Sequence, residues 1–191
     1  MSADVPVPED FRKRVLDAAC DELIRWGVDR FSIVALADRH GLDPELIQQH
    51  WPTADRLVLE VLLGWPSTER FELPDTGLLH TDLLALATWM ADYVTSETGR
   101  GLQLAHIIAN PNLPTARIRK EAWRARSDNL RVVVERARER GELRDGVDAL
   151  SLLELLFAPI NMRELFTGEP VDEEYCRNLA ELVCRAVATA P

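Results

Sequence analysis

The chain has 191 residues, 47% hydrophobic and 28% charged, which is enough for one or two small globular domains. Its net charge of −10 argues against a protein that binds nucleic acid through overall basicity, although net charge does not determine fold. Three cysteines cannot all pair within one chain and no Cys-x-x-Cys occurs, which favours a reducing compartment.

The first helical pattern spans residues 9–26, and the next two helices are marked by their ends. Ser32 can cap the N-terminus of a helix that ends before Gly41, where a left-handed residue is favoured. Asp43 can cap a following helix whose first position is Pro44, which needs no N–H. Two short helices joined by a tight turn are typical of a helix–turn–helix, whose second helix enters the DNA major groove.

Every later pattern also has helical period, and strand signals are missing. A helix capped by Thr53 is expected to end near Gly64, before a linker over residues 66–77. We expect Gly99 and Gly101 to break the next helix, because glycine destabilises helix interiors. The helices expected after the linker are residues 78–96, 102–109, 114–140, 149–167 and 173–188. The chain is therefore expected to be all-α.

The head, residues 1–65, contains a distinctive series of apolar and small residues. The series comprises the run 12–19, then Leu23, Ile24, Gly27, Phe31, Ser32, Ile33, Leu36, Ala37, Gly41, Leu42, Ile47, His50, Trp51 and Leu57. Their order and spacing resemble the DNA-binding domain of the TetR family of bacterial repressors over about 50 residues. The resemblance implies a regulator that binds a palindromic double-stranded DNA operator as a homodimer, and whose binding responds to a ligand.

The head departs from the family pattern at three positions. Gln48 and Ala54 stand where the family has a Tyr and a Lys that contact phosphates, and Asp43 replaces a capping Ser or Thr. The head carries seven lysines and arginines against twelve aspartates and glutamates. Because phosphate contacts dominate non-specific affinity, we expect weak binding to generic DNA. The alternative is a TetR-fold protein that binds small molecules and has lost DNA binding.

A second resemblance covers the C-terminal part. Residues 134–143 form an Arg-rich run that ends in Arg-Gly-Glu-Leu, and Asp148, Pro159, Ile160, Arg163, Thr167 and Gly168 follow. This pattern resembles one class of TetR C-terminal domains, with Ala158 in place of the family's Gly. The two resemblances together imply a three-helix helix–turn–helix domain over residues 1–52. They imply a ligand-binding and dimerising helical bundle over residues 53–191.

Candidate DNA contacts lie around the expected recognition helix. Its start, Asp43 and Pro44, is followed by Glu45, Gln48 and Gln49, which we expect to meet base edges. Gln can pair bidentately with adenine, and Glu can accept from the amino group of cytosine. The residues expected to contact phosphates are Arg12, Lys13, Ser32 and His50.

Aromatic and polar residues of the middle helices are candidates for an effector pocket. They are Trp89, Met90, Tyr93, His106, Trp123 and Phe157. Ligand sites between helices are mostly apolar with a few polar groups, so the expected effector is a small apolar or aromatic molecule. The open alternative is that these residues only fill the core.

Residues 149–167 are apolar almost throughout. A helix that is apolar all round must be buried on all sides, which in a chain of this length suggests a second subunit. TetR-like proteins dimerise through their last two long helices, as a four-helix bundle. The expected interface core is Leu152, Leu156, Ile160, Leu179, Val183 and Val187.

Signals for catalysis, metals and membranes are missing. The chain shows no Gly-rich phosphate loop and no nucleophile with a credible base, so we expect no enzyme and no cofactor. His40 and His50 are not spaced as metal ligands and lack a Cys or third His nearby, so no metal site is expected. Without a leader or an apolar run of about 18 residues, a cytoplasmic protein is expected.

Overall fold

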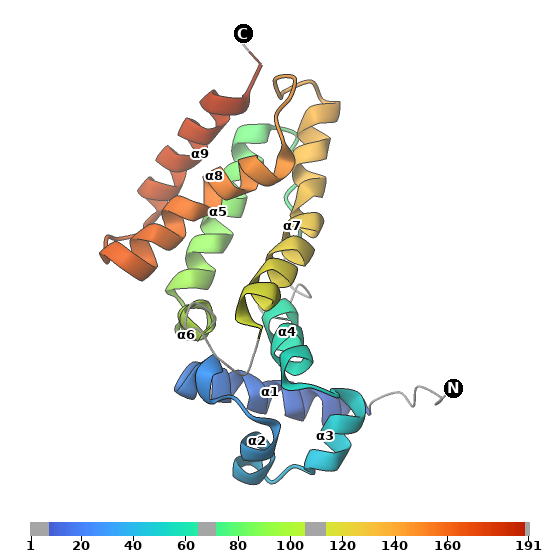
Figure 1. Cartoon of the computed structure of the whole chain (residues 1–191). Coiled ribbons are helices and arrows are strands. Elements are labelled where there is room, and N and C mark those ends of the chain that lie inside the picture. The colour runs from blue at the N-terminus through green and yellow to red at the C-terminus, as the bar shows by residue number, and fades with distance from the viewer. Residues whose placement is uncertain (1–7, 65–71, 106–113, 190–191) are drawn as a thin grey trace. The chain divides into compact units, whose positions relative to one another are not determined.

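The computed structural model describes residues 8–64, 72–105 and 114–189, which are almost entirely helical (Figure 1). The α-helices are α1 (Glu9–Trp26), α2 (Ile33–His40), α3 (Pro44–His50), α4 (Ala54–Gly64), α5 (Leu79–Thr95), α6 (Glu97–Ala105), α7 (Thr115–Glu139), α8 (Ala149–Met162) and α9 (Glu173–Val187). Among these residues, β-pairing is limited to an isolated antiparallel bridge between Leu143 and Ala188. The expected all-α fold is confirmed.

The chain divides into two compact units. The first unit comprises residues 1–65 and 101–122, and the second comprises residues 66–100 and 123–191. Helix α4 packs against α1 and therefore belongs to the first unit. The first boundary between the packed units therefore falls at residue 65 and not at residue 52. The expected boundary at residue 52 between a DNA-binding domain and a ligand-binding domain stays a prediction.

Helix ends follow the capping residues of the sequence. The Asp148 carboxylate accepts a hydrogen bond from the Ser151 N–H at 2.8 Å, and the Asp172 carboxylate accepts one from the Tyr175 N–H at 2.8 Å. Gly41, with φ +62°, ends α2 in the left-handed conformation. The bounds of α1 to α4 agree with the expected ones, and both α2 and α3 begin at the capping side chains expected for them.

Each unit has its own apolar core. In the first unit α1 contributes Val15, Ala19 and Leu23, which are fully buried. In the second unit α5 packs against α8 and α9. The largest buried side chains of the second core are Leu79, Leu83, Leu86, Met90, Leu152, Leu153 and Phe157. No described helix is long and apolar enough to cross a bilayer.

The expectation that Gly99 and Gly101 break a helix is wrong. Helix α5 ends earlier, at Thr95, and Ser96 begins a new turn by accepting a hydrogen bond from the Gly99 N–H at 3.0 Å. Both glycines lie inside α6. A Cβ at Gly99 would stand 1.9 Å from the Tyr93 carbonyl oxygen, so close approach of α5 requires glycine there. Residues 106–109 of the expected short helix lie outside the described residues.

The helix expected over residues 149–167 also changes character before its end. Its α-helical part stops at Met162, and Arg163–Thr167 continue as a π-helical turn. Gly168, with φ +69°, closes this turn by donating its N–H to the Arg163 carbonyl at 2.8 Å.

Candidate functional site

A short turn with defined hydrogen bonds joins α2 to α3. Gly41 takes the left-handed conformation and the Leu42 N–H donates to the Ala37 carbonyl at 2.9 Å. The Asp43 carboxylate then accepts from the N–H groups of Glu45 at 2.9 Å and Leu46 at 3.3 Å. Asp43 therefore caps α3 as expected, and the geometry is that of a helix–turn–helix.

Helix α3 is anchored on one side and open on the other. Ile47 and Trp51 are buried in the first core. Glu45, Gln48 and Gln49 are all exposed, and Pro44 in the first turn is half-buried. The residues expected to meet base edges are thus brought together on the accessible side of α3, where two amides offer donors and acceptors.

The expected phosphate contacts differ in their availability. Lys13 is exposed, and the Ser32 hydroxyl accepts only a long hydrogen bond from the Ala35 N–H, at 3.5 Å. The Arg12 guanidinium pairs with Glu60 at 2.5 Å. His50 is half-buried, and its ring lies 6.3 Å from that of Phe11, centroid to centroid. Arg12 and His50 therefore also have structural contacts within the head.

Two acidic residues that the sequence analysis missed organise the head. Glu60 of α4 accepts from the Trp51 indole N–H at 2.6 Å besides pairing with Arg12. Glu22 of α1 is buried and contacts Arg39 and His40 at the end of α2. A signal for Glu22 existed, because it follows Ala18 and Val15 at helical spacing and so falls on the apolar face of α1.

The second unit contains an aromatic cluster of Trp89, Tyr93, Trp123 and Phe157. The rings of Trp89 and Tyr93 stack with centroids 6.5 Å apart. Phe157 lies edge-on to both Trp89 and Trp123, with a centroid separation of 6.4 Å in each pair. The structure therefore brings together four of the six residues expected to bind an effector.

The remaining members of that set are Met90 and His106. Met90 is buried in the second core, as Tyr93 and Phe157 of the cluster also are, and His106 lies outside the described residues. Polar groups at the cluster are the Glu154 carboxylate, which accepts from the Trp123 indole at 3.3 Å, and the Arg126 guanidinium, 5.6 Å from the Tyr93 ring centroid. The cluster thus combines four aromatic rings with an acidic and a basic group, and its rings belong to the second core or pack against it.

The residues expected at a dimer interface lie in the core of their own chain. All six are buried where α5 packs against α8 and α9, and their part in a dimer stays a prediction: Leu152, Leu156, Ile160, Leu179, Val183 and Val187. Helical periodicity identified a buried face but not what covers it. The large apolar side chains exposed on these helices and the π-helical turn are Leu155, Met162, Phe166 and Leu182.

The fold and the turn geometry define a helix–turn–helix protein with a helical C-terminal unit. Residues 73–183, more than half of the chain, match the family model described as "Tetracyclin repressor-like, C-terminal domain". The chain belongs to the TetR family of ligand-responsive, DNA-binding transcription regulators.

Named relatives agree with this assignment. The HTH-type transcriptional regulator YdeS of Bacillus subtilis (strain 168) is 28% identical over 177 residues, which cover 91% of this chain and 88% of that protein. The HTH-type transcriptional regulator AqdR of Rhodococcus erythropolis is 29% identical over 139 residues, which cover 73% of this chain and 67% of that protein. The crystal structure of the TetR family transcription regulator SCO0332 superimposes with a TM-score of 0.70 at 25% identity. The superposition covers 96% of this chain and 100% of that one. These likenesses do not favour the alternative of a protein without DNA binding.

Proposed function

We propose that the chain acts in the cytoplasm as a homodimeric repressor that leaves its palindromic operator when a small apolar or aromatic effector binds at the aromatic cluster. The observation that carries the DNA-binding part is the anchoring of α3. Its buried Ile47 and Trp51 hold the helix in place. Glu45, Gln48 and Gln49 stay exposed for base edges.

Selection from random DNA duplexes with the full chain tests whether the protein binds a specific operator. Selection at low salt should recover a palindrome whose half-sites are about 34–36 Å apart or somewhat more, because a two-fold dimer spaces its recognition helices by successive major grooves. Gln49→Ala should relax preference at one position of each half-site, whereas Lys13→Ala should weaken all duplexes alike. Arg144→Ala, at an exposed cation between α7 and α8, is the matched charge control and should leave binding to every duplex unchanged. Failure to recover any preferred palindrome would rule out the repressor.

The dimer is proposed to form through the exposed side of α8, the π-helical turn and α9. Leu155, Ala158, Met162 and Phe166 recur at spacings of three or four along the chain and are exposed, as is Leu182 on α9. Exposed large apolar side chains at such spacing suit an obligate interface, which is large and apolar.

The effector is proposed to contact the aromatic cluster, with Glu154 and Arg126 as polar partners. One acidic and one basic group beside four rings favour a largely apolar molecule with one or two polar groups. A panel of mono- and bicyclic aromatic compounds, followed by tryptophan fluorescence, would identify binders. Phe157→Ala should weaken any such binder, and Val132→Ala on the exposed side of α7 should not.

A further inference from the structure

Glu22 is a charged residue in an apolar core. Its side chain lies on α1 among buried residues and is about 5% exposed. Burying a carboxylate is costly unless it is paired and hydrogen-bonded. Both oxygens of Glu22 are used: Oε2 pairs with the Arg39 guanidinium, and Oε1 lies 3.3 Å from Nε2 of His40.

Both partners of Glu22 belong to the last turn of α2. That turn carries partial negative charge from its free carbonyls, which favours the cationic Arg39 there. The Arg39 guanidinium also lies 5.6 Å from the ring centroid of Trp26 at the end of α1. The last turn of α2 is thus tied to α1 by directional contacts, in addition to the apolar packing of Leu36 and Ala37.

Only residues 41–43 separate this turn from the recognition helix. The Gly41 N–H bonds back to Ala37, as does the Leu42 N–H, and Asp43 caps α3. The link therefore has little freedom, and an orientation imposed on the last turn of α2 is passed on to α3.

We infer that Glu22 is a positioning residue for DNA binding: through Arg39 and His40 it sets the orientation in which α3 meets base edges. The inference rests on the DNA-binding role of the chain and names a determinant of its specificity. Glu22 itself is buried beneath α2 and contacts no DNA.

Positioning can be separated from stability. Leucine at position 22 leaves no buried charge behind, because the Arg39 side chain that loses its partner is 44% exposed and can be hydrated. Glu22→Leu should therefore fold, but leave the last turn of α2 less well oriented. Base contacts need this orientation, whereas contacts to phosphates of random DNA depend on it much less.

The test measures the affinity of the full chain for its selected operator and for a random duplex of equal length. Glu22→Leu should weaken operator binding about tenfold, the order expected for one misplaced base contact, and leave random-duplex binding within about twofold. Asp21→Leu is the matched control, because Asp21 is exposed on the same helix; it should leave the operator-to-random ratio unchanged. An unchanged ratio in Glu22→Leu would overturn the inference.

A double-mutant cycle asks whether Glu22 acts through Arg39. Because Arg39 carries part of the effect of Glu22, the specificity lost by Glu22→Leu with Arg39→Leu should be smaller than the sum of the two single losses. Additive losses would mean that Arg39 meets DNA independently, and would overturn the positioning role of Glu22.

Amide hydrogen exchange gives a readout that needs no DNA. Glu22→Leu should speed exchange in the last turn of α2 and the first turn of α3, without changing protection in α5, α8 and α9. Asp21→Leu should change neither. If the unmodified chain selects no operator, the proposed repressor fails, while unchanged protection of α2 and α3 in Glu22→Leu would separately overturn this inference.

Discussion

Burial controls the chemistry of individual cysteines in this chain. Desolvation raises the pKa of the Cys20 thiol to about 11, and the nearby carboxylates of Asp21 and Asp17 add to the effect. Burial likewise raises the pKa of Cys176 and Cys184 above their usual range. Because the thiolate is the reactive form, these three free thiols are poorly suited to redox sensing.

Alkylation tests this directly at Cys20. A pKa raised from 9.0 to about 11 leaves roughly a hundredfold less thiolate at pH 8, so iodoacetamide should label Cys20 far more slowly than a free cysteine. The rate should climb as pH rises toward the raised pKa. Peptide mass spectrometry would measure it, with guanidinium-unfolded chain as the control. Rapid labelling of folded chain at pH 8 would contradict the prediction.

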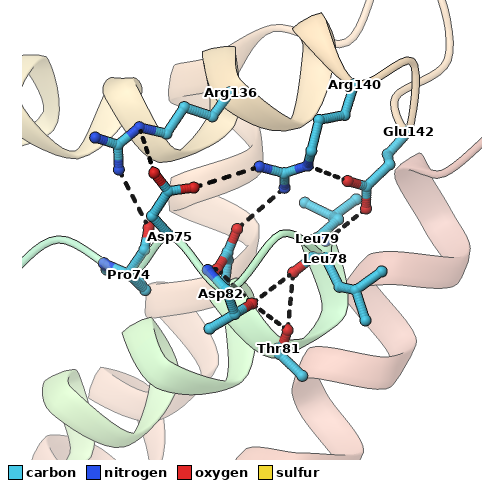
Figure 2. A network of polar contacts seen from close by, with 10 residues as sticks. Pro74, Asp75, Leu78, Leu79, Thr81, Asp82, Arg136, Arg140 and Glu142 are labelled. Carbon is cyan, nitrogen blue, oxygen red and sulfur yellow. Dashed lines mark hydrogen bonds and ion pairs between the residues drawn. The ribbon is translucent and has the colours of Figure 1, made fainter.

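Between elements, the junction of α5 with α7 depends on a polar network around the buried Asp82 (Figure 2). Asp82 of α5 is fully buried and accepts from the Thr76 N–H at 2.8 Å and from the Arg140 guanidinium at 3.1 Å. Glu142 pairs with Arg140 and accepts from the Leu79 N–H at 2.5 Å, which satisfies a free donor in the first turn of α5. The Arg-Gly-Glu-Leu motif therefore clamps the start of α5 to the end of α7.

Removing Arg140 should be costly for the second unit. Arg140→Met leaves the buried Asp82 without its cation, and the free energy of unfolding should fall by about 3 kcal/mol, at the low end for breaking a buried pair because Thr76 remains. Urea denaturation would measure the loss. Arg185→Met, which removes an exposed pair with Glu181, should cost less than about 1 kcal/mol. Equal effects of the two variants would contradict the clamp.

Local signals in the sequence predicted the helices well, because their ends depend on neighbouring residues. Ser32, Gly41, Asp43, Asp148 and Asp172 each mark a helix end in the structure. Gly99 misled because it admits the Tyr93 carbonyl, six residues earlier, at the turn from α5 to α6 rather than ending a helix. The spacing of glycines in the sequence does not reveal that the Tyr93 carbonyl lies so close to Gly99.

The same limit explains the outcome at the candidate sites. The four aromatic residues come together because the inward faces of their helices pack around one core. Helical periodicity in the sequence identifies those inward faces. Periodicity also identified Leu152 and Leu179 as buried residues. It could not show that other helices of the same chain cover them. Glu22 and Glu60 escaped notice because charged residues are usually exposed, and only the fold shows their partners.

For the whole molecule, the exposed apolar side chains predict where a second subunit binds. Leu155 on α8 and Leu182 on α9 are 48% and 63% exposed. Replacing both by Glu would bury unpaired charges in the interface, so the double variant should become a 21.6 kDa monomer by light scattering at micromolar concentration.

Val132→Glu is the matched control for this experiment. Val132 is an exposed apolar residue of α7, away from α8 and α9 in sequence, and its replacement should leave the oligomeric state unchanged. A monomeric unmodified chain would remove the dimer altogether. A double variant that stays dimeric would place the interface on another surface.

An effector bound in the second unit can change operator affinity only by its different affinity for two states of the whole protein. Such coupling is typically about 1–3 kcal/mol, or roughly 5- to 150-fold in affinity, and it is reciprocal. Operator DNA must therefore change effector affinity by the same factor as the effector changes operator affinity.

Fluorescence of Trp89 and Trp123, which lie in the aromatic cluster, allows effector titrations with operator and with a random duplex as control. Phe157→Ala should reduce effector affinity with either duplex, because it removes a ring that the effector is proposed to contact and leaves the coupling intact. Identical effector affinities with operator and random duplex would show that a molecule bound at the cluster does not control the head, even where it binds tightly.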